Sequence, residues 1–225
     1  VDFTGHSANL LLSTLAVGGR SAATTAAGTG IFSFDSGTLD ATTVNIAART
    51  GTTATSGSVT GTVNLGGGTS TIGTVTMSTN NVALTASNST GDAISTLNIS
   101  GGTVSINALT MGVNTVAAAF ASGSNTDATL NISGGATTVN TTFTMGAQNS
   151  ALDAGVTVNS ALSALNISAG SLTLAGSTNL TMGATTLDAH NAATANINIT
   201  GTGSLTVGGN IQYTNGLGTE TNTIT

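Results

Sequence analysis

The carboxylates of this 225-residue chain are the first groups that could do chemistry, because glycoside hydrolysis uses a pair of them across one cleft. The densest acidic stretch is FDSGTLD, which holds Asp35 and Asp40. Aspartate at a bend is more often a turn former, and we favour that interpretation for both residues. If the chain acted on polysaccharides, these two aspartates would be the best available acids.

The two arginines are the only cationic side chains apart from two histidines. Arg20 and Arg49 each follow a recurring apolar residue, Val17 or Ile46, by three positions, so we expect them to stack on neighbouring repeats. Two guanidinium groups there would clamp a carboxylate or sulfate. We favour the alternative of solvated arginines, or of partners for the nearby aspartates, because surface ion pairs rarely carry function.

Histidines and the remaining aspartates do not form a recognisable site. His6 and His190 lie far apart in the chain, and Asp188 near His190 is accompanied by neither a serine nucleophile elbow nor zinc-ligand spacing. A calcium site would need aspartates in one column, with the glycine-rich nonapeptide of calcium-binding β-rolls, and that nonapeptide is missing. The sequence therefore predicts no catalytic, cofactor-binding or metal-binding residue and no cofactor. The aspartates weighed for calcium are Asp92, Asp127, Asp153 and Asp188.

Composition excludes several classes of partner. Charged residues are 4% of the chain, the net charge is −6, and cysteine is absent. With two arginines and no lysine there is no basic patch, so we expect neither nucleic-acid binding nor attraction to anionic lipid. The longest apolar run, VAAAFA at 116–121, is far too short to span a membrane.

The elements that must position these residues recur with a period of 31–35 residues. The phrase TLNISGGTVSINALTMG at 96–112 returns, with changes, from Thr129 and from Leu165. All four methionines fall in one column of this repeat. That column is Val17, Ile46, Met77, Met111, Met145, Met182 and Tyr213, and a second apolar column is Val1, Phe32, Val63, Leu97, Leu130, Leu165 and Ile197.

Each repeat contains three short segments in which apolar and polar residues alternate, separated by glycine or asparagine steps. Alternation with period two predicts half-buried strands, and the short steps suit tight bends. We therefore predict an all-β, right-handed parallel β-helix (β-solenoid) of about seven coils, with three short strands and one long variable arc per coil. An antiparallel sandwich of hairpins is the less favoured alternative, and residues 1–225 are expected to form one domain.

Outward positions also align between repeats. Stacked asparagine amides are expected to hydrogen-bond along the rod and stabilise the sheet. One such column is Asp2, Ser33, Asn64, Asn98, Asn131, Asn166 and Asn198. A second column is Asn45, Thr76, Thr110, Thr144, Thr181 and Gln212. Ice binding needs several outward threonines per strand in a fixed grid; we expect about one per strand, and the repeat length varies, so the pattern argues against it.

The repeated phrase resembles the Gly/Ser/Thr/Asn-rich β-strand repeats of very long secreted bacterial surface proteins, including passenger regions of autotransporter-like adhesins. The resemblance covers essentially the whole chain. It implies a parallel β-helix exposed at the cell surface that acts in adhesion or as a fibre or matrix component, and it brings no catalytic residues.

The expected function is that of a non-catalytic, secreted structural rod that contributes to a surface fibre, filament or matrix layer. The alternatives are an adhesin that binds glycans or cell surfaces, and a polysaccharide lyase or hydrolase. Both ends read as strands without caps, so we expect end-to-end stacking or continuation in a longer chain. The apolar arcs around Val116, Phe120 and Leu152 are expected to make lateral contacts.

Overall fold

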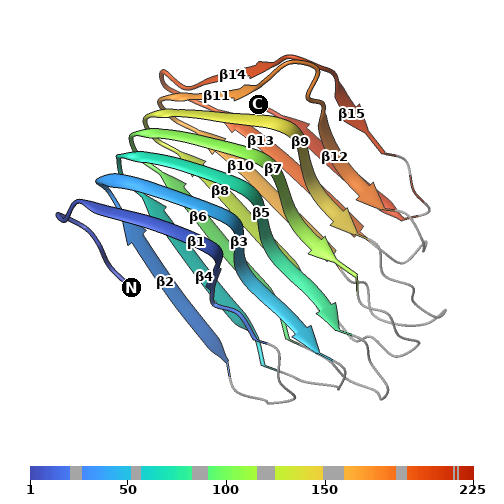
Figure 1. Cartoon of the computed structure of the whole chain (residues 1–225). Coiled ribbons are helices and arrows are strands. Elements are labelled where there is room, and N and C mark those ends of the chain that lie inside the picture. Colours follow the sequence, from blue (N-terminus) through green and yellow to red (C-terminus); the bar gives the residue numbers. More distant parts are fainter. Residues whose placement is uncertain are drawn as a thin grey trace.

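A computed structural model describes residues 1–20, 27–51, 57–82, 91–115, 125–148, 160–185, 192–214, 216 and 218–225. They form an all-β solenoid, which confirms the predicted fold class (Figure 1). The chain winds alternately through two parallel sheets, here called sheet A and sheet B, that enclose the apolar side chains. Every strand pair within both sheets is parallel.

Sheet A contains seven short strands, one from each successive coil. Its strands are β2 (Gly28–Phe34), β4 (Val59–Leu65), β6 (Ala93–Ile99), β8 (Thr126–Ile132), β10 (Ser160–Ile167), β13 (Ala192–Ile199) and β16 (Thr219–Ile224). Sheet B contains β1 (Ala8–Val17), β3 (Gly37–Gly51), β5 (Thr69–Val82), β7 (Thr103–Asn114), β9 (Ala136–Gln148), β11 (Ser171–Leu174), β12 (Leu180–Thr185), β14 (Ser204–Val207) and β15 (Ile211–Tyr213).

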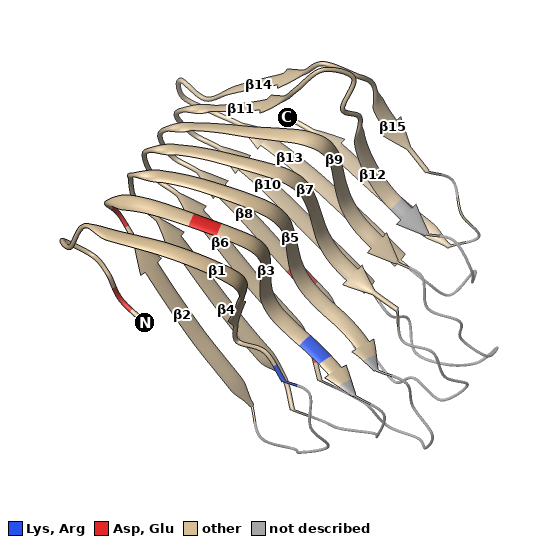
Figure 2. Ribbon diagram, in the orientation of Figure 1, with Lys and Arg blue, Asp and Glu red and all other residues tan. Residues whose placement is uncertain are grey.

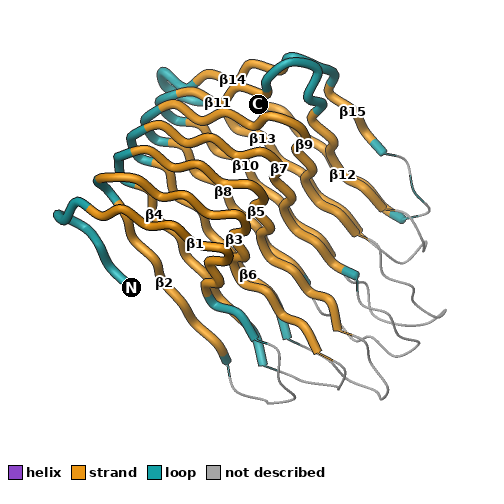
Figure 3. Tube along the Cα trace, viewed as in Figure 1, coloured by secondary structure: helices purple, strands orange, loops and turns teal. Residues whose placement is uncertain are grey.

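The expectation of three short strands per coil holds only near the C-terminal end. In β3, β5, β7 and β9 the second and third expected segments are one continuous bent strand, whereas β11 is separate from β12 and β14 from β15 (Figure 3). The pairing of β7 with β9 shifts register between Ile106 and Ala108, as in a β-bulge, so the strand turns without losing its hydrogen bonds. In the later coil a turn at Gly176–Ser177 interrupts the strand instead.

The solenoid has about five turns, slightly fewer than the seven predicted. The coils at the two ends are incomplete. Residues 1–3 contribute only an isolated bridge between Asp2 and Ser33 to sheet A, and β16 is followed by no strand of sheet B.

The bore of the solenoid is filled by the apolar columns that the repeat predicted. The strand register places each methionine of the recurrent column on the next, and all four methionines are fully buried. Phe32, Val63 and Leu97 likewise stack on neighbouring strands of sheet A. Because like side chains lie directly above one another, each coil buries the apolar face of its neighbour.

The residue that follows the methionine column has a positive φ in successive coils. These residues are Gly18, Ala47, Ser78, Gly112, Gly146 and Gly183. The left-handed backbone turns two consecutive side-chain positions inward, as the burial of both Met111 and Gly112 shows. Three copies of this step read Met-Gly in the sequence, because glycine adopts a positive φ without a steric penalty.

Candidate functional site

Among the acidic residues of the first coils, Asp2 and Asp35 bind the turn at Thr4 and Gly5, whereas Asp40 lies within strand β3, so the turn-former interpretation is wrong for Asp40. Asp2 lies beside Ser33, as predicted, and its Oδ1 accepts hydrogen bonds from the backbone N (2.9 Å) and the Oγ1 (2.6 Å) of Thr4. These bonds lower the pKa of Asp2, because they favour the carboxylate. Asp35 Oδ2 accepts a hydrogen bond from Gly5 N at 2.8 Å, while Asp40 is exposed on the outer face of β3. These placements give Asp35 and Asp40 different surroundings.

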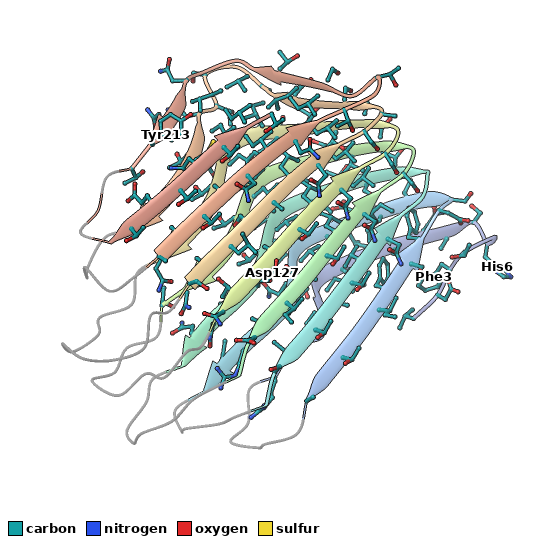
Figure 4. The ribbon with its side chains drawn as sticks, turned by 180° about the vertical axis from the view of Figure 1, so that it is seen from behind. Phe3, His6, Asp127 and Tyr213 are labelled. Carbon is teal, nitrogen blue, oxygen red and sulfur yellow. The ribbon has the colours of Figure 1, made fainter. Side chains whose placement is uncertain are left out.

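The charged residues of the described chain are few and isolated (Figure 2). His6 lies at the N-terminal end in the same turn as Asp2, where its Nδ1 is 3.0 Å from Thr4 O (Figure 4). Asp153, Asp188 and His190 are outside the described residues. Within the described ranges, no three His, Cys, Asp or Glu side chains gather closely enough to hold a metal ion.

The two arginines are stacked as predicted, but the favoured interpretation of both as solvated surface residues is wrong. Arg20 and Arg49 form a parallel bridge on neighbouring coils, and Arg49 is only 1% exposed. Its Nη1 donates to Asn80 Oδ1 at 3.0 Å and to Gly91 O at 2.9 Å. Burial, followed by the charge of Arg20, lowers the pKa of Arg49 to about 10, although Asp92 opposes the shift.

Arg49 begins a column of buried polar side chains that the sequence did not predict. The strand register continues the column through Asn80, Asn114 and Gln148, each of which is fully buried. The facing inner column of sheet A is made of small residues, among them Ala93 and Ala161. The bore therefore has two compartments, a large apolar one and a smaller polar one where the strands of sheet B end and those of sheet A begin.

Cross-sheet hydrogen bonds separate the two compartments at what we call the waist. The waist is formed by the positive-φ residues of sheet B and by Gly30, Gly61, Ser95, Ala128, Ser163 and Ala195 of sheet A. Ser78 Oγ donates to Asp127 O and accepts from Ser95 Oγ at 2.7 Å. Ser163 Oγ accepts from Gly146 N (2.9 Å) and donates to Met111 O (3.1 Å). The sheets thus touch through short polar groups at this line.

Asp92 and Asp127 lie near one another but have separate roles. Asp92 Oδ1 accepts from Asn125 N at 3.0 Å, and Asn125 Oδ1 in turn accepts from Ser160 N at 3.1 Å. Each side chain thus binds the backbone of the next coil where the strand begins. Asp127 lies between Ile94 and Leu162 on the outer face of sheet A (Figure 4). Burial, and secondarily Asp92, raises the pKa of Asp127.

Asp127→Asn is expected to raise the melting temperature at neutral pH by about 1–2 °C. A raised pKa means that the folded state disfavours the carboxylate, so this cost is complete above the folded pKa and disappears as the pH falls toward the ordinary value of 3.8. The gain from asparagine should therefore vanish in acid. Thermal unfolding of both proteins across this pH range checks the sign; a gain that persisted well below 3.8 would show that charge is not its source.

The outward asparagine column forms the predicted hydrogen-bonded ladder. Asn64 donates to Ser33 Oγ at 3.2 Å. Along the rod, the amide nitrogens of Asn98, Asn131 and Asn166 each donate to the amide oxygen of the preceding asparagine, at 2.8, 2.9 and 2.9 Å. These bonds run parallel to the backbone ladder and tie the same coils together, which supports a stabilising role.

Asn131→Ala is expected to lower the free energy of unfolding by about 1–2 kcal/mol. The substitution removes two ladder bonds, one to Asn98 and one to Asn166. Thr129→Ala, two residues away on the same outer face, is the matched control and should cost less. Chemical denaturation measures both; equal losses would mean that the amide bonds contribute nothing beyond strand propensity.

The outer face of sheet B carries more threonines than the sequence predicted. We expected about one outward threonine per strand, but β5 alone has Thr69, Thr71 and Thr74 exposed on its outer side. The count was too low because adjoining segments merge into one strand. The variable repeat length does not prevent a regular grid of outward side chains either. The register still places Thr69 beside Thr103 and Thr71 beside Ser105.

Comparisons with protein-family models, curated proteins and solved structures found no match. None of the described residues forms a helix long and apolar enough to cross a membrane. The described phenylalanines pack in or against the bore, and Tyr213 lies at its C-terminal end. Neither outer face thus offers the aromatic surface that lines many ligand sites. The edges and the polar outer faces of the solenoid are therefore the candidate sites of interaction.

Proposed function

We propose that this chain is a non-catalytic structural rod of the extracellular surface, extended by further coils of the same kind to form a fibre or matrix layer. The supporting observation is the contrast between the buried middle of the solenoid and its open edges. In the Met column, Met182 is fully buried, whereas Tyr213 on the next coil is 55% exposed. A further coil stacked on β15 would bury the tyrosine in the same way.

At the N-terminal edge, formed by β1, the inner apolar columns are also incompletely buried. Leu10, Leu12 and Leu15 of β1 continue the inner columns of sheet B but are only partly buried. A pocket of about 510 Å³ at this edge is lined by Leu15, Val17, Ile31 and backbone of the adjoining glycines. A strand at the edge of a sheet presents a row of unpaired N–H and C=O groups, to which a further strand can pair. The coils to be added would come from the same chain or from another copy.

The outer faces support a structural role as well. On the outer face of sheet A, the asparagine side chains hydrogen-bond to neighbouring coils in a continuous ladder. Repeated uncharged polar residues of this kind stabilise the stacked coils, and they do not by themselves specify a ligand. No observation favours the adhesin or the polysaccharide-cleaving alternative over the rod.

Sedimentation velocity and electron microscopy of the purified chain at increasing concentration test the proposal. We expect association into rods of constant width, weakened by Tyr213→Glu, which places a charge in the column at the open edge. Leu11→Glu is the matched control, because Leu11 is 83% exposed and points away from the bore. Monomers at every concentration, or equal effects of both variants, would overturn it.

A further inference from the structure

Ten outward positions of sheet B, two on each of five coils, form a regular array that we call the hydroxyl face. Nine of the ten are threonine or serine. The first column is Thr69, Thr103, Ala136, Ser171 and Ser204, and the second is Thr71, Ser105, Thr138, Thr173 and Thr206. The two columns run side by side in unbroken register; the register shift between β7 and β9 lies at Ile106/Ala108, beyond both columns.

The spacing of this array is fixed in both directions by strand geometry. Neighbouring coils are about 4.8 Å apart, and side chains two residues apart on one strand are about 6.6 Å apart. The residues between the columns point inward and support the face from inside the bore; Ser70, Val104, Thr137 and Leu172 among them are at most 2% exposed. Because a packed interior deforms little, the outer positions form a rigid grid.

The chemistry of the hydroxyl face is uniform and uncharged. None of its ten positions carries a charge; the nearest acid in its second column is Asp40, on the coil before it. Thr71, Thr138 and Thr173 make no side-chain hydrogen bond to another described residue, so their hydroxyls face solvent; Ser105 Oγ accepts from Asn140 Nδ2 at 3.1 Å. Each threonine presents a methyl group, which restricts adjacent water, and a hydroxyl, which hydrogen-bonds it.

We propose that the hydroxyl face binds the surface of ice. A rigid grid of methyl and hydroxyl groups holds water in fixed rows, with spacings of the same magnitude as those between oxygens on ice crystal faces. Water bridging two fixed polar groups binds nearly as well as a direct bond, and many weak contacts add over the face. This activity is independent of rod assembly, since all ten positions of the array lie within one chain.

The outer face of sheet A provides an internal comparison. Its columns also contain threonines, such as Thr62, Thr96 and Thr129, but Ala164 interrupts that column. The neighbouring column contains Ile94, Asp127 and Leu162 in succession. A charge and large apolar groups break the grid there, so sheet A is expected to leave ice growth unaffected.

Inhibition of ice recrystallisation and partitioning into growing ice, measured on the intact chain, test the proposal. We expect the wild type to be active, and Thr71→Tyr with Thr138→Tyr to raise the concentration required at least about tenfold, a loss of about 1.4 kcal/mol of adsorption. Tyrosine suits strands, so folding should persist, which circular dichroism and the melting temperature check. The matched control, Thr62→Tyr with Thr129→Tyr on sheet A, should retain wild-type activity.

Three results would overturn the proposal: a wild type without effect on ice, retained activity in the sheet B variant, or equal loss in the sheet A control. Binding to insoluble cellulose or chitin in place of ice, lost in the same sheet B variant, would also overturn it and assign the face to polysaccharide. Thr173→Val keeps the shape of the face and removes one hydroxyl. It should reduce activity less than the tyrosine pair, while leaving filament formation unchanged.

Discussion

Gly61→Val is expected to prevent the chain from folding into a stable solenoid. Gly61 lies on the sheet A side of the waist, and a Cβ added there would lie 2.7 Å from Ala47 N and 2.8 Å from Ile46 Cγ2, and closer still to Val17 O. Two of these three atoms belong to the backbone of the opposite sheet, so rotation of a side chain cannot relieve the overlap. We expect a loss of about 4 kcal/mol or more, above the usual cost of about 1–3 kcal/mol for overpacking a core, because the overlap is with backbone that cannot rotate away.

The matched control is Gly19→Val. Only Ala48 O lies near the Cβ position of Gly19, at 3.9 Å, so the same substitution meets open space there. Circular dichroism and thermal unfolding of the two variants provide the measurement, with Gly61→Ala as an intermediate step that adds the Cβ alone. A Gly61→Val protein that melted within a few degrees of wild type would mean that the sheets can separate at the waist without cost.

The columns of the bore and the asparagine ladder could be predicted because they require only a repeat and a register. Met77, Met111 and Met145 recur at one point of a short phrase, and strands that stack like residues over one another are the simplest structure that buries them. Asn98 and Asn131 follow from the same register, since they lie next to buried isoleucines. The repeat thus contains the information on which residues are neighbours.

The burial of Arg49 could not be predicted in this way, because strict alternation fails at the waist. Counting outward from Ile46 with period two places Ala47 outside and Arg49 outside. The positive φ of 55° at Ala47 turns that residue inward as well, which reverses the parity for the rest of the strand. Alanine does not indicate a left-handed backbone in the sequence. The Met-Gly copies of this step in later coils do indicate one, because glycine favours a positive φ.

The hydroxyl face was missed for a different reason. The prediction of about one outward threonine per short strand leaves Thr103 out of the outer face that contains Ser105. The backbone remains extended and paired from Thr103 onward, which places its side chain in the same outer plane as Ser105. Strand limits, which depend on hydrogen bonding to neighbouring coils, are the least visible property of a single repeat.

The prediction that the apolar arcs make lateral contacts is not tested by the described residues. Val116, Phe120 and Leu152 lie outside the described residues, so their lateral packing stays a prediction. Among the described residues, the polar compartment extends to the start of β6 through Arg49, whose guanidinium binds Gly91 O. A single side chain therefore connects the end of β3 to the start of a strand on the opposite sheet, and this is where a substitution should have a large effect.

Arg49→Met is expected to lower the free energy of unfolding by about 2–4 kcal/mol. Methionine matches the length of the buried stem, but it leaves Gly91 O and Asn80 Oδ1 without the donor that now serves both. Removing the charge returns part of this loss, because burial beside Arg20 disfavours the guanidinium, as the lowered pKa shows. The unsatisfied acceptors outweigh that gain, since a buried polar group without a partner costs more than a typical hydrogen bond contributes.

Two further variants separate the contributions in denaturation experiments. Arg49→Lys keeps the charge but offers a compact ammonium in place of the planar fork, so it should recover only part of the loss. Arg20→Met removes the neighbouring guanidinium, which is only partly buried and binds Gly57 O, and should cost less than Arg49→Met. If Arg49→Met were as stable as wild type, the polar compartment would be held by Asn80, Asn114 and Gln148 alone, and the arginine would be a tolerated charge. If Arg49→Lys were as stable as wild type, one donor would suffice, and the bond from β3 to the start of β6 would not depend on the geometry of the guanidinium.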